Sequence, residues 1–518
     1  MFDVIIVGGG PVGLFLACEL KLAGAAPVVL ERLPGANQAD KAHGLTGQVV
    51  RLLDHRGLFE RCSGTERPVP APGFFFGALP LPLHVLGPDN PMYLLPINQR
   101  DLEAVLAERA AELGVDVRRG YDVLSVDQAD DQVDVVASDR TCAETTFSAR
   151  FVVGCDGAHS LVRKQSGIGF PGVTDDSLVG RSALVGPIEH LRPTADGQIF
   201  VDGLGKIPAA FHRTERGVLT IGLFDPEHPL VHTMEWEDDG PDSFPGPGAP
   251  MTLNEMEASV ARVLGVRVPL SPPADGEPTL LRRLRGRNTR LAERYRDRRV
   301  FLAGDAAHVH AAAGGPGLNL ALQDAANLAW KLAAAIHGWA PEQLLDTYET
   351  ERRALGEQVF MQTQAQTALM APGSDVTALR QLFAELLTRR DNVQQVADLL
   401  AGADVRYDMG EERPAASTGW FAPDLALTTE DGRAQRLAEL LRDARPLLLD
   451  TTGDTSLAAA AAPWADRVVR VSAQVESAPA PALLVRPDGY VAWAGADPDG
   501  LRTALHRWFG AAQDRVAA

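Results

Sequence analysis

The stretch Asp3–Gly24, DVIIVGGGPVGLFLACELKLAG, decides the fold of the chain. It starts with a short apolar run that ends in glycines, a pattern that predicts a buried strand. Pro11 then opens a predicted helix through about Ala23, with Gly24 as its stop. A second apolar run, APVVLER, predicts another buried strand. Strand, helix and strand within about 30 residues form a βαβ unit, which predicts a parallel sheet.

Three glycines of this stretch, Gly8, Gly10 and Gly13, have the spacing Gly-x-Gly-x-x-Gly. Backbone N–H groups at a helix N-terminus hold a pyrophosphate only where side chains leave room for it. Glu31 closes the second strand at the spacing that meets a ribose hydroxyl. An acid at this point disfavours a 2′-phosphate, so the pattern predicts FAD or NAD rather than NADP. The alternative is a glycine-rich turn in some other α/β fold.

Length, charge and cysteine content limit the classes of function. The chain has 518 residues, a length that suggests about three domains, and its hydrophobic content of 45% is ordinary for a globular protein. The net charge of −19 argues against a nucleic-acid partner, which needs a basic face. The four cysteines form no C-x-x-C pair and no metal-spaced cluster, which indicates a reducing compartment and no metal site. Because neither a signal peptide nor a membrane span is apparent, we expect a cytoplasmic protein without a membrane partner.

The rest of the chain divides into regions of different pattern. Residues 100–114 predict an amphipathic helix, and residues 121–149 predict a small antiparallel insertion, followed by the buried strand FVVGCDG. From 176 to 278, alternating segments between loops rich in Pro and Gly predict a mostly antiparallel sheet with one packed and one free face. A buried strand and long helices return at 279–402, and a small α/β unit follows at 403–518.

Two further motifs follow the glycine motif, GCDGAHSLVR at 154–163 and GDAAHVHAAAGGPGLN at 304–319. In this order the trio resembles the FAD-dependent aromatic hydroxylases, the single-component flavoprotein monooxygenases typified by para-hydroxybenzoate hydroxylase. Within that family it is most similar to enzymes that tailor aromatic polyketides and related antibiotics. The resemblance covers roughly residues 2–400, and KAHGLTGQVVRLLDHRGL, INQRDLEAVL and LLDTYETERR also fall at the family's positions.

The resemblance implies an α/β fold with a Rossmann-like FAD-binding domain of the glutathione-reductase type, built from residues 1–175 and 279–402. An interleaved antiparallel-sheet substrate domain would span 176–278, with a contribution from about 70–97. The segment LLVRPDGYVAW resembles the late strand–turn–strand of a thioredoxin-like domain appended to many of these hydroxylases, at 403–518. This domain has no cysteine and therefore no disulfide exchange, so its role would be structural or in assembly. A homodimer is among the possible assemblies.

The resemblance assigns the adenosine half of FAD to the first motif and its surroundings. The glycines would cradle the pyrophosphate, and Glu31 would bind the adenosine ribose beside Arg32. Leu124 would lie near the adenine, and Gln99 would meet the ribityl or pyrophosphate region. The residues assigned to this half are Gly8, Gly10, Pro11, Val12, Gly13, Glu31, Arg32, Gln99 and Leu124.

The second and third motifs would hold the flavin half. Asp156 and Gly157 would serve both FAD and the nicotinamide cofactor, with the charge of Arg163 nearby. Asp305 would hydrogen-bond a ribityl hydroxyl, and the backbone at 315–319 would approach the isoalloxazine. The helix that follows would aim its partly positive N-terminus at the edge of the ring where negative charge develops on reduction. The residues assigned to this half are Asp156, Gly157, Arg163, Gly304, Asp305, Pro316, Gly317, Leu318 and Asn319.

The activity implied by the resemblance is monooxygenation of a polycyclic aromatic substrate. NADPH or NADH reduces the flavin, O₂ adds to give a C4a-hydroperoxyflavin, and the distal oxygen passes to an electron-rich ring. Baeyer–Villiger oxygenation of a polyketide ketone is one alternative, distinguished by a lactone product. The other is a flavoprotein that binds a reactive intermediate without its own turnover, distinguished by the lack of substrate-stimulated NAD(P)H oxidation.

Three positions depart from the family's pattern. Ala312 stands where the family usually has Pro, and Pro316 where it often has Gln. Gln48 replaces a usual Arg near the flavin, and losing that charge could weaken stabilisation of the reduced flavin. We favour compensation of this charge by Lys41 or Arg51 over an altered reaction.

The substrate site is expected between the middle sheet and the third motif. Within DAAH, His308 is expected to be structural, and His310 to line the loop. His212, in AAFHR, is the candidate for a base that deprotonates a phenol, although a strand histidine is more often structural. Ordinary core packing is the alternative for the apolar candidates. The residues expected to line the substrate are Tyr93, Phe211, His212, Met234, Trp236, Ala312, Gly314 and Gly315.

Overall fold

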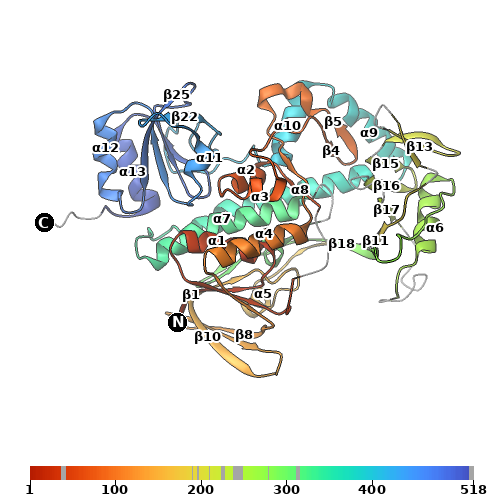
Figure 1. The fold of residues 1–518 in the computed structure, drawn as a ribbon, viewed down its shortest axis with the longest axis horizontal. Coiled ribbons are helices and arrows are strands. Elements are labelled where there is room, and N and C mark those ends of the chain that lie inside the picture. The colour runs from red at the N-terminus through yellow and green to blue at the C-terminus, as the bar shows by residue number, and fades with distance from the viewer. Residues whose placement is uncertain are drawn as a thin grey trace.

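The computed structural model describes residues 1–36, 43–188, 191–194, 198–208, 210–222, 228–236, 249–277, 279–310 and 315–512. Figure 1 shows a sheet around β1 (Phe2–Val7), a second sheet with α6 (Leu253–Leu264) at one end of the molecule, and the blue C-terminal domain at the other end. The long helices α7 (Pro316–Ile336) and α8 (Asp346–Met370) run between these parts. No helix among the described residues is both long and apolar enough to cross a membrane.

The glycine motif lies in an eight-stranded sheet with the main path β19-β20-β10-β1-β2-β7. Its further strands are β2 (Pro27–Glu31), β7 (Asp116–Arg119), β8 (Asp122–Gln128), β9 (Val133–Ser138), β10 (Glu144–Gly154), β19 (Arg296–Asp297) and β20 (Val300–Leu302). β1 pairs in parallel with β2 and β10, and α1 (Pro11–Leu22) connects β1 to β2, which confirms the predicted βαβ unit. The last strand of the antiparallel insertion and the buried strand before Cys155 are one continuous strand, β10. Its first half pairs with β9, and its second half pairs with β20.

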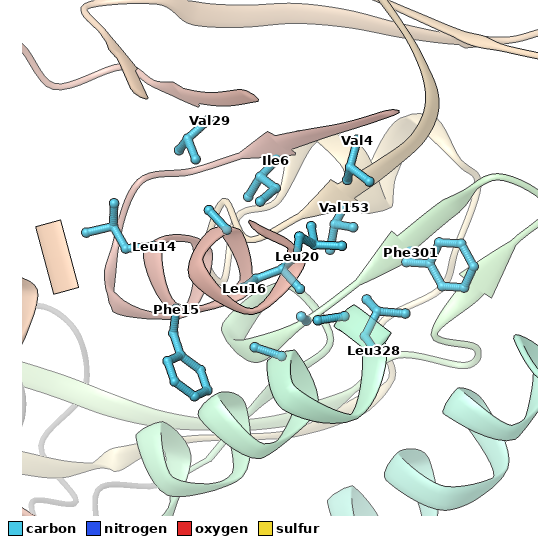
Figure 2. Packing of buried hydrophobic residues seen from close by; sticks show 14 of the residues in the cluster. Val4, Ile6, Leu14, Phe15, Leu16, Leu20, Val29, Val153, Phe301 and Leu328 are labelled. Carbon is cyan, nitrogen blue, oxygen red and sulfur yellow. The ribbon is translucent and has the colours of Figure 1, made fainter. Parts of the chain in front are cut away.

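The core of this sheet packs around α1 (Figure 2). Leu14, Leu16 and Leu20 are all fully buried, although they point to different sides of the helix. The helices α4 (Gln99–Glu112) and α7 both pack against α1. A helix enclosed in this way is apolar nearly all round. The glycine motif is therefore attached to the buried core of the first sheet.

The middle of the chain forms a six-stranded antiparallel sheet with the order β15-β16-β17-β11-β18-β21. Its strands are β11 (Gly172–Leu184), β15 (Phe211–Thr214), β16 (Gly217–Gly222), β17 (Leu230–Trp236), β18 (Leu281–Leu291) and β21 (His308–Val309). β21 belongs to the third motif and ends shortly before α7. The sheet is therefore joined directly to the loop that is expected to hold the flavin.

One face of this sheet is covered by α6, a helix that the sequence analysis did not predict. The Thr252 side chain accepts a hydrogen bond from Glu255 N at its start, and Gly265, at a φ of +78°, ends it. Both are ordinary helix boundary signals. The sheet also carries the ribbon β12 (Leu191–Pro193), β13 (Gln198–Val201) and β14 (Gly205–Pro208) at its side.

Short elements and three helices complete the main body. The hairpin of β4 and β5 contacts the middle sheet, because the Phe75 and Phe211 rings meet edge to face at 5.1 Å. The β3 strand pairs with β6 beside the glycine motif. The bounds are β3 (Leu45–Thr46), α2 (Gln48–Asp54), α3 (Phe59–Ser63), β4 (Phe74–Phe76), β5 (Leu79–Leu81), η1 (Leu83–Asp89), β6 (Leu94–Leu95), α5 (Leu161–Gln165), η3 (Gly304–Ala306), α9 (Ser374–Leu386) and α10 (Arg390–Ala401).

The C-terminal domain has a six-stranded sheet with the order β23-β22-β25-β24-β26-β27. β24 is parallel to β25 and antiparallel to β26, and β26 is antiparallel to β27. Its elements are β22 (Ala426–Thr429), β23 (Ala434–Arg436), α11 (Leu437–Leu440), β24 (Leu447–Asp450), α12 (Thr455–Ala461), η4 (Ala462–Trp464), β25 (Val469–Val475), β26 (Ala482–Val485), β27 (Val491–Ala494) and α13 (Pro498–Phe509).

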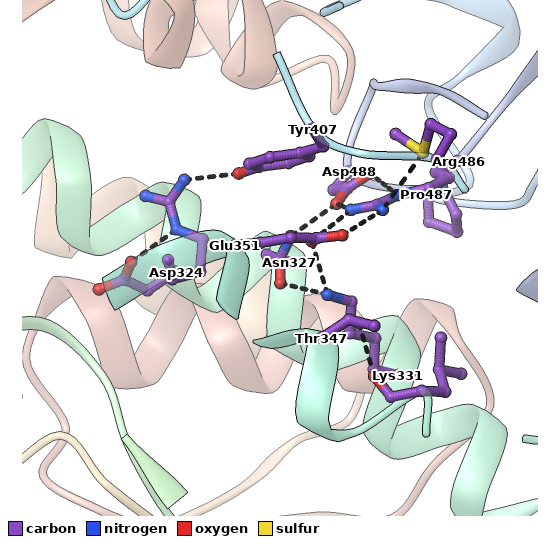
Figure 3. Close-up of polar contacts among 12 residues, drawn as sticks. Asp324, Asn327, Lys331, Thr347, Glu351, Tyr407, Arg486, Pro487 and Asp488 are labelled. Carbon is purple, nitrogen blue, oxygen red and sulfur yellow. Dashed lines mark hydrogen bonds and ion pairs between the residues drawn. The ribbon is translucent and has the colours of Figure 1, made fainter. Parts of the chain in front are cut away.

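A buried charge network fixes this domain to α7 and α8 (Figure 3). Arg486 donates to both carboxylate oxygens of Glu351, at 2.7 and 2.8 Å, and also pairs with Asp488. Lys331 Nζ donates to the same Glu351 carboxylate at 2.7 Å. Asn327 links Glu351 and Asp488 from the side of α7. These groups are buried away from water. Removal of any one of them would leave a charged partner unpaired and would destabilise the fold.

Candidate active site

The three motif glycines have different structural reasons to be glycine. A Cβ at Gly8 would lie 2.4 Å from Cys155 O, and one at Gly13 would lie 2.0 Å from Gly8 O. A Cβ at Gly10 would meet no atom within 4 Å, and no side chain caps the start of α1 there. The first and third glycines therefore serve close packing within the protein. Gly10 instead leaves an open cradle in front of free helix N–H groups, which fits a pyrophosphate.

The Glu31 carboxylate joins the two loops beside this cradle. Its Oε2 accepts from Gly9 N at 2.6 Å, and its Oε1 accepts from Leu33 N at 2.8 Å. A carboxylate has about four acceptor positions, so two remain for ribose hydroxyls. Arg32 is exposed beside it.

Two other residues expected at the adenosine half lie on separate elements. The Leu124 side chain is 41% exposed on β8, which leaves an apolar surface open near this sheet. Gln99, at the start of α4, donates to Glu103 Oε1 at 2.9 Å.

The second motif, at residues 154–163, contacts both the first and the third motif. Asp156 Oδ2 caps α5 by accepting from Leu161 N at 2.7 Å, whereas its Oδ1 is buried without a partner and burial raises the pKa of this carboxyl. Arg163 donates to Ala306 O and Ala158 O, and its guanidinium lies 3.8 Å from the centre of the Phe170 ring. Arg163 is thus a structural link to η3, and its donors are committed to carbonyls.

The third motif returns the chain to the glycine cradle. A Cβ at Gly304 would lie 3.2 Å from Val12 Cγ2, so the two motifs are in contact. Asp305 follows on η3 with an exposed side chain. At the start of α7, no side chain of the described residues caps Gly315, and Cβ atoms at Gly315 and Gly317 would meet none of their atoms within 4 Å. This second open cradle, before a helix of 21 residues, fits a ring that acquires negative charge.

Asn319 holds the strand β3 and Gly315 to this helix. Its Oδ1 accepts from Thr46 N at 3.0 Å, and its Nδ2 donates to Thr46 Oγ1 and Gly315 O. Pro316 is the first residue of α7, where its missing N–H costs no hydrogen bond. Leu318 packs at the edge of the core of the first sheet.

The two histidines of the third motif differ in their surroundings. His308 is fully buried, and its Nε2 lies 2.6 Å from Asp324 Oδ2, while Arg352 donates to Oδ1 of the same carboxylate at 2.8 Å. His310 stacks on His308 at 5.2 Å, and both of its ring nitrogens are buried without partners. Burial lowers the pKa of His310 to about 3, so the ring is neutral. His310 therefore presents polar atoms beside the loop toward α7.

Gln48 and Arg51 face the C-terminal domain. Arg51 donates to Gln48 Oε1 at 3.1 Å and to Ala422 O, and its guanidinium lies 5.0 Å from the centre of the Phe421 ring. Burial lowers the pKa of Arg51. The charge of Arg51 is thus held at the domain contact. Lys41, Ala312 and Gly314 lie outside the described residues.

The substrate candidates fall on two faces of the middle sheet. Phe211 pairs with Thr220, and Met234 and Trp236 alternate on β17 with buried residues that face α6. These three candidates therefore share the free face, because directly paired residues point to the same side. His212 pairs with Leu219, which is buried against α6. The structure does not bring His212 to the free face, because a strand residue next to Phe211 must point the other way.

Tyr93 lies apart from this sheet, in the segment beside β6, and its backbone carbonyl accepts from Gly47 N at 2.9 Å. Sequence reasoning missed His232 and Ser182, which lie on the free face. The alternation in LVHTMEW contained the signal, because it places His232, Met234 and Trp236 on one side. The described residues contain no cluster of three or more His, Cys, Asp or Glu that could hold a metal ion.

We expect the Asp305→Ala variant to purify with little FAD. Asp305 follows the strand β20 and is exposed beside the contact of the first and third motifs, so its loss removes a ligand group without opening the core. The measurement is the ratio of the flavin absorbance to the protein absorbance. Full FAD content in this variant would count against a hydrogen bond between Asp305 and the ribityl chain of FAD.

Comparison with known proteins agrees with this geometry. The FAD binding domain family matches residues 1–193 and 271–363, and the aromatic-ring hydroxylase C-terminal domain family matches residues 415–512. The chain is 38% identical to a rifampicin monooxygenase of Streptomyces venezuelae, over 99% of both chains. It is 37% identical to a dialkyldecalin synthase of Streptomyces rugosporus, over 98% of this chain and 99% of the other.

The solved OxyS anhydrotetracycline hydroxylase from Streptomyces rimosus superposes with a TM-score of 0.84 at 37% identity, covering 99% of this chain and 100% of that one. The open cradles at Gly10 and at 315–317 and the spare acceptor positions of Glu31 fit FAD. The chain belongs to the FAD-dependent aromatic-ring hydroxylases, and it is a flavin-dependent monooxygenase similar to antibiotic-tailoring enzymes.

Proposed function

We propose that the protein hydroxylates a polycyclic aromatic, polyketide-type substrate, using NAD(P)H and O₂, in the biosynthesis or modification of a secondary metabolite. The free face of the middle sheet carries the proposal. It combines aromatic and apolar side chains with a few polar ones, and through β21 it continues into the loop that precedes α7. Relatives named as a rifampicin monooxygenase and an anhydrotetracycline 6-monooxygenase support this substrate class.

Bound FAD supplies the redox chemistry, because it accepts a hydride from NAD(P)H and activates O₂ for transfer of one oxygen atom. The protein contributes the surroundings. The uncapped N-terminus of α7 at Gly315 and Gly317 offers N–H groups and a partly positive field to the edge of the ring that gains charge. The hydrogen bonds between Asn319 and Thr46 hold β3 against this helix. The neutral ring of His310 adds no charge beside it.

The remaining finer assignments are also proposals. We propose NADPH as the reductant, which is the habit of the family that the chain resembles. We propose a thioredoxin-like fold for the C-terminal domain, supported by its strand order β25-β24-β26-β27 with only the first pair parallel. Because this domain has no cysteine, we infer a structural role for it within a cytoplasmic enzyme.

One alternative has a specific observation in its favour. A relative of similar identity over the full length is named a dialkyldecalin synthase, a name that describes ring formation. A flavoprotein of this kind would bind FAD and a polycyclic intermediate without consuming NADPH. The two functions differ in whether substrate stimulates NADPH oxidation.

The test is the visible spectrum of the purified protein, followed by anaerobic addition of NADPH with and without a polycyclic phenol. Flavin bands that bleach faster in the presence of the phenol are the expected result. A yellow protein that NADPH does not bleach under either condition would favour the non-redox alternative. A colourless protein would contradict the positioning of FAD.

A further inference from the structure

One side chain from each of five neighbouring strands forms a row across the free face of the middle sheet. In the order β15, β16, β17, β11 and β18 the strand register pairs each residue with the next. Because direct partners point to the same side, all five side chains share this face. The row consists of Phe211, Thr220, His232, Ser182 and Arg282.

The row is less buried than the opposite face, although the β4–β5 hairpin packs against its Phe211 end. Ser182 is 7% exposed, but the other four side chains are each half-buried. The residues that alternate with His232 on β17, Val231 and Thr233, are sealed under α6. The side chains of the row are therefore more exposed because α6 does not cover their face of the sheet, and not only because some of them lie on edge strands.

His232 is the best-held polar group in the row. Its Nδ1 lies 2.9 Å from Ser182 Oγ, a hydrogen-bond distance. A Cβ at Gly180 would lie 3.5 Å from His232 Cε1, so the absence of a side chain there leaves space beside the ring. Its second nitrogen, Nε2, has no side-chain partner among the described residues. Ser182 and the Arg181 backbone therefore hold the ring, and Nε2 is the nitrogen that can face a ligand.

The surroundings of His232 favour the neutral form of its ring. Burial lowers the pKa of His232 to about 4, the charge of Arg282 on β18 and the neighbouring His43 lower it further, and a hydrogen bond with the Arg181 backbone raises it. His43 precedes the segment that Asn319 holds at α7. His232 is thus neutral near pH 7. A neutral imidazole can accept a hydrogen bond from an acidic hydroxyl.

We propose that His232, fixed by Ser182, accepts a hydrogen bond through Nε2 from a phenolic or enolic hydroxyl of the substrate and selects for substrates that carry this group. The inference rests on the proposed function, and it names the substrate chemistry that this site prefers. Arg282, in the same row, adds positive charge where such a hydroxyl gains negative charge. A site that bonds a hydroxyl disfavours a ligand that cannot donate, because its buried acceptor is then left unpaired.

The chain provides a matched control for this inference. His212 is a histidine of the same sheet, two strands away, with its pKa also lowered by burial, but it points to the α6 side. A variant of His212 tests the loss of an imidazole from the sheet without a change on the free face. FAD content and the melting temperature of each variant show whether it is folded.

The experiment measures binding of 2-hydroxyanthraquinone and its methyl ether to the oxidised holoenzyme, from the change in flavin absorbance without NADPH. We expect the wild type to bind the hydroxyl compound about tenfold more tightly, as expected for one hydrogen bond of about 1.4 kcal/mol. His232→Ala and His232→Asn should reduce this preference below about threefold, Ser182→Ala should reduce it in part, and His212→Ala should retain it.

A second readout is the ionisation of the bound hydroxyl, followed by its visible absorbance against pH. Removal of His232 should change the apparent pKa of the bound phenol, and removal of His212 should not. A wild type that binds both probes equally or neither, or His232 variants that keep the full preference, overturns the inference. If His232 controls the preference but NADPH never bleaches the flavin, the site assignment holds and the hydroxylation proposal fails.

Discussion

Gly10→Val is expected to give a folded protein without FAD. Gly10 has a φ of −75° and a ψ of −174°, a conformation that valine adopts readily, and a Cβ there meets no protein atom within 4 Å. The protein alone therefore tolerates the side chain. The valine instead fills the space in front of the N-terminus of α1, where the pyrophosphate must approach the backbone.

FAD content of the purified variant, and the dissociation constant for FAD added to the apoprotein, measure this effect. We expect a loss of binding of at least 100-fold, about 2.7 kcal/mol, with far-UV circular dichroism unchanged. Gly73→Val is the matched control, because Gly73 is exposed and a Cβ there makes only an ordinary contact, 3.6 Å from Leu81 O. Normal FAD binding by Gly10→Val would show that the cofactor does not use this cradle.

Arg486→Met is expected to destabilise the protein by about 3–5 kcal/mol. Arg486 is 0% exposed and pairs with the Glu351 and Asp488 carboxylates. Methionine keeps much of the volume but leaves two buried carboxylates with only Lys331 and Asn327 as partners. Removal of one member of a buried ion pair is costly because the remaining charge stays desolvated.

Urea unfolding followed by tryptophan fluorescence measures this loss, since the Arg486 guanidinium lies 4.7 Å from the centre of the Trp508 ring. Arg502→Met removes a guanidinium that pairs with the exposed Asp499, and its expected cost is below about 1 kcal/mol. Equal stability losses in the two variants would mean that the network in Figure 3 does not hold the domain.

The parts of the site that depend on local sequence pattern could be predicted. The spacing of Gly8, Gly10 and Gly13 predicted the turn between β1 and α1. Gly8 and Gly13 allow the backbone to pack closely, and Gly10 leaves the cradle open. The helix α6 was missed although Thr252 and Gly265 mark its ends, because it lies between segments rich in Pro and Gly that favoured strands and loops.

Features that depend on distant parts of the chain could not be predicted. His212 points toward α6 and His232 toward the free face because of which face of the sheet α6 covers, and local pattern gives only the alternation within each strand. Glu351 and Arg486 are 135 residues apart, and their pairing follows only from the docking of the C-terminal domain. Likewise, the contacts of Arg51 with Ala422 O and the Phe421 ring, beside its hydrogen bond to Gln48, depend on the docked C-terminal domain.

The FAD-binding region closes only late in biosynthesis. Thr46 and Asn319, which join β3 to α7, are 273 residues apart, and β20, which follows the middle region in sequence, joins the sheet of β1. At a translation rate of about 5–20 residues per second, roughly 15–60 s pass between synthesis of α1 and synthesis of α7. During that interval the apolar side of α1 that α7 later covers stays exposed on the ribosome. Slow, non-local closure of this kind makes nascent chains prone to aggregation, so soluble yield should rise with chaperone supply and with lower growth temperature.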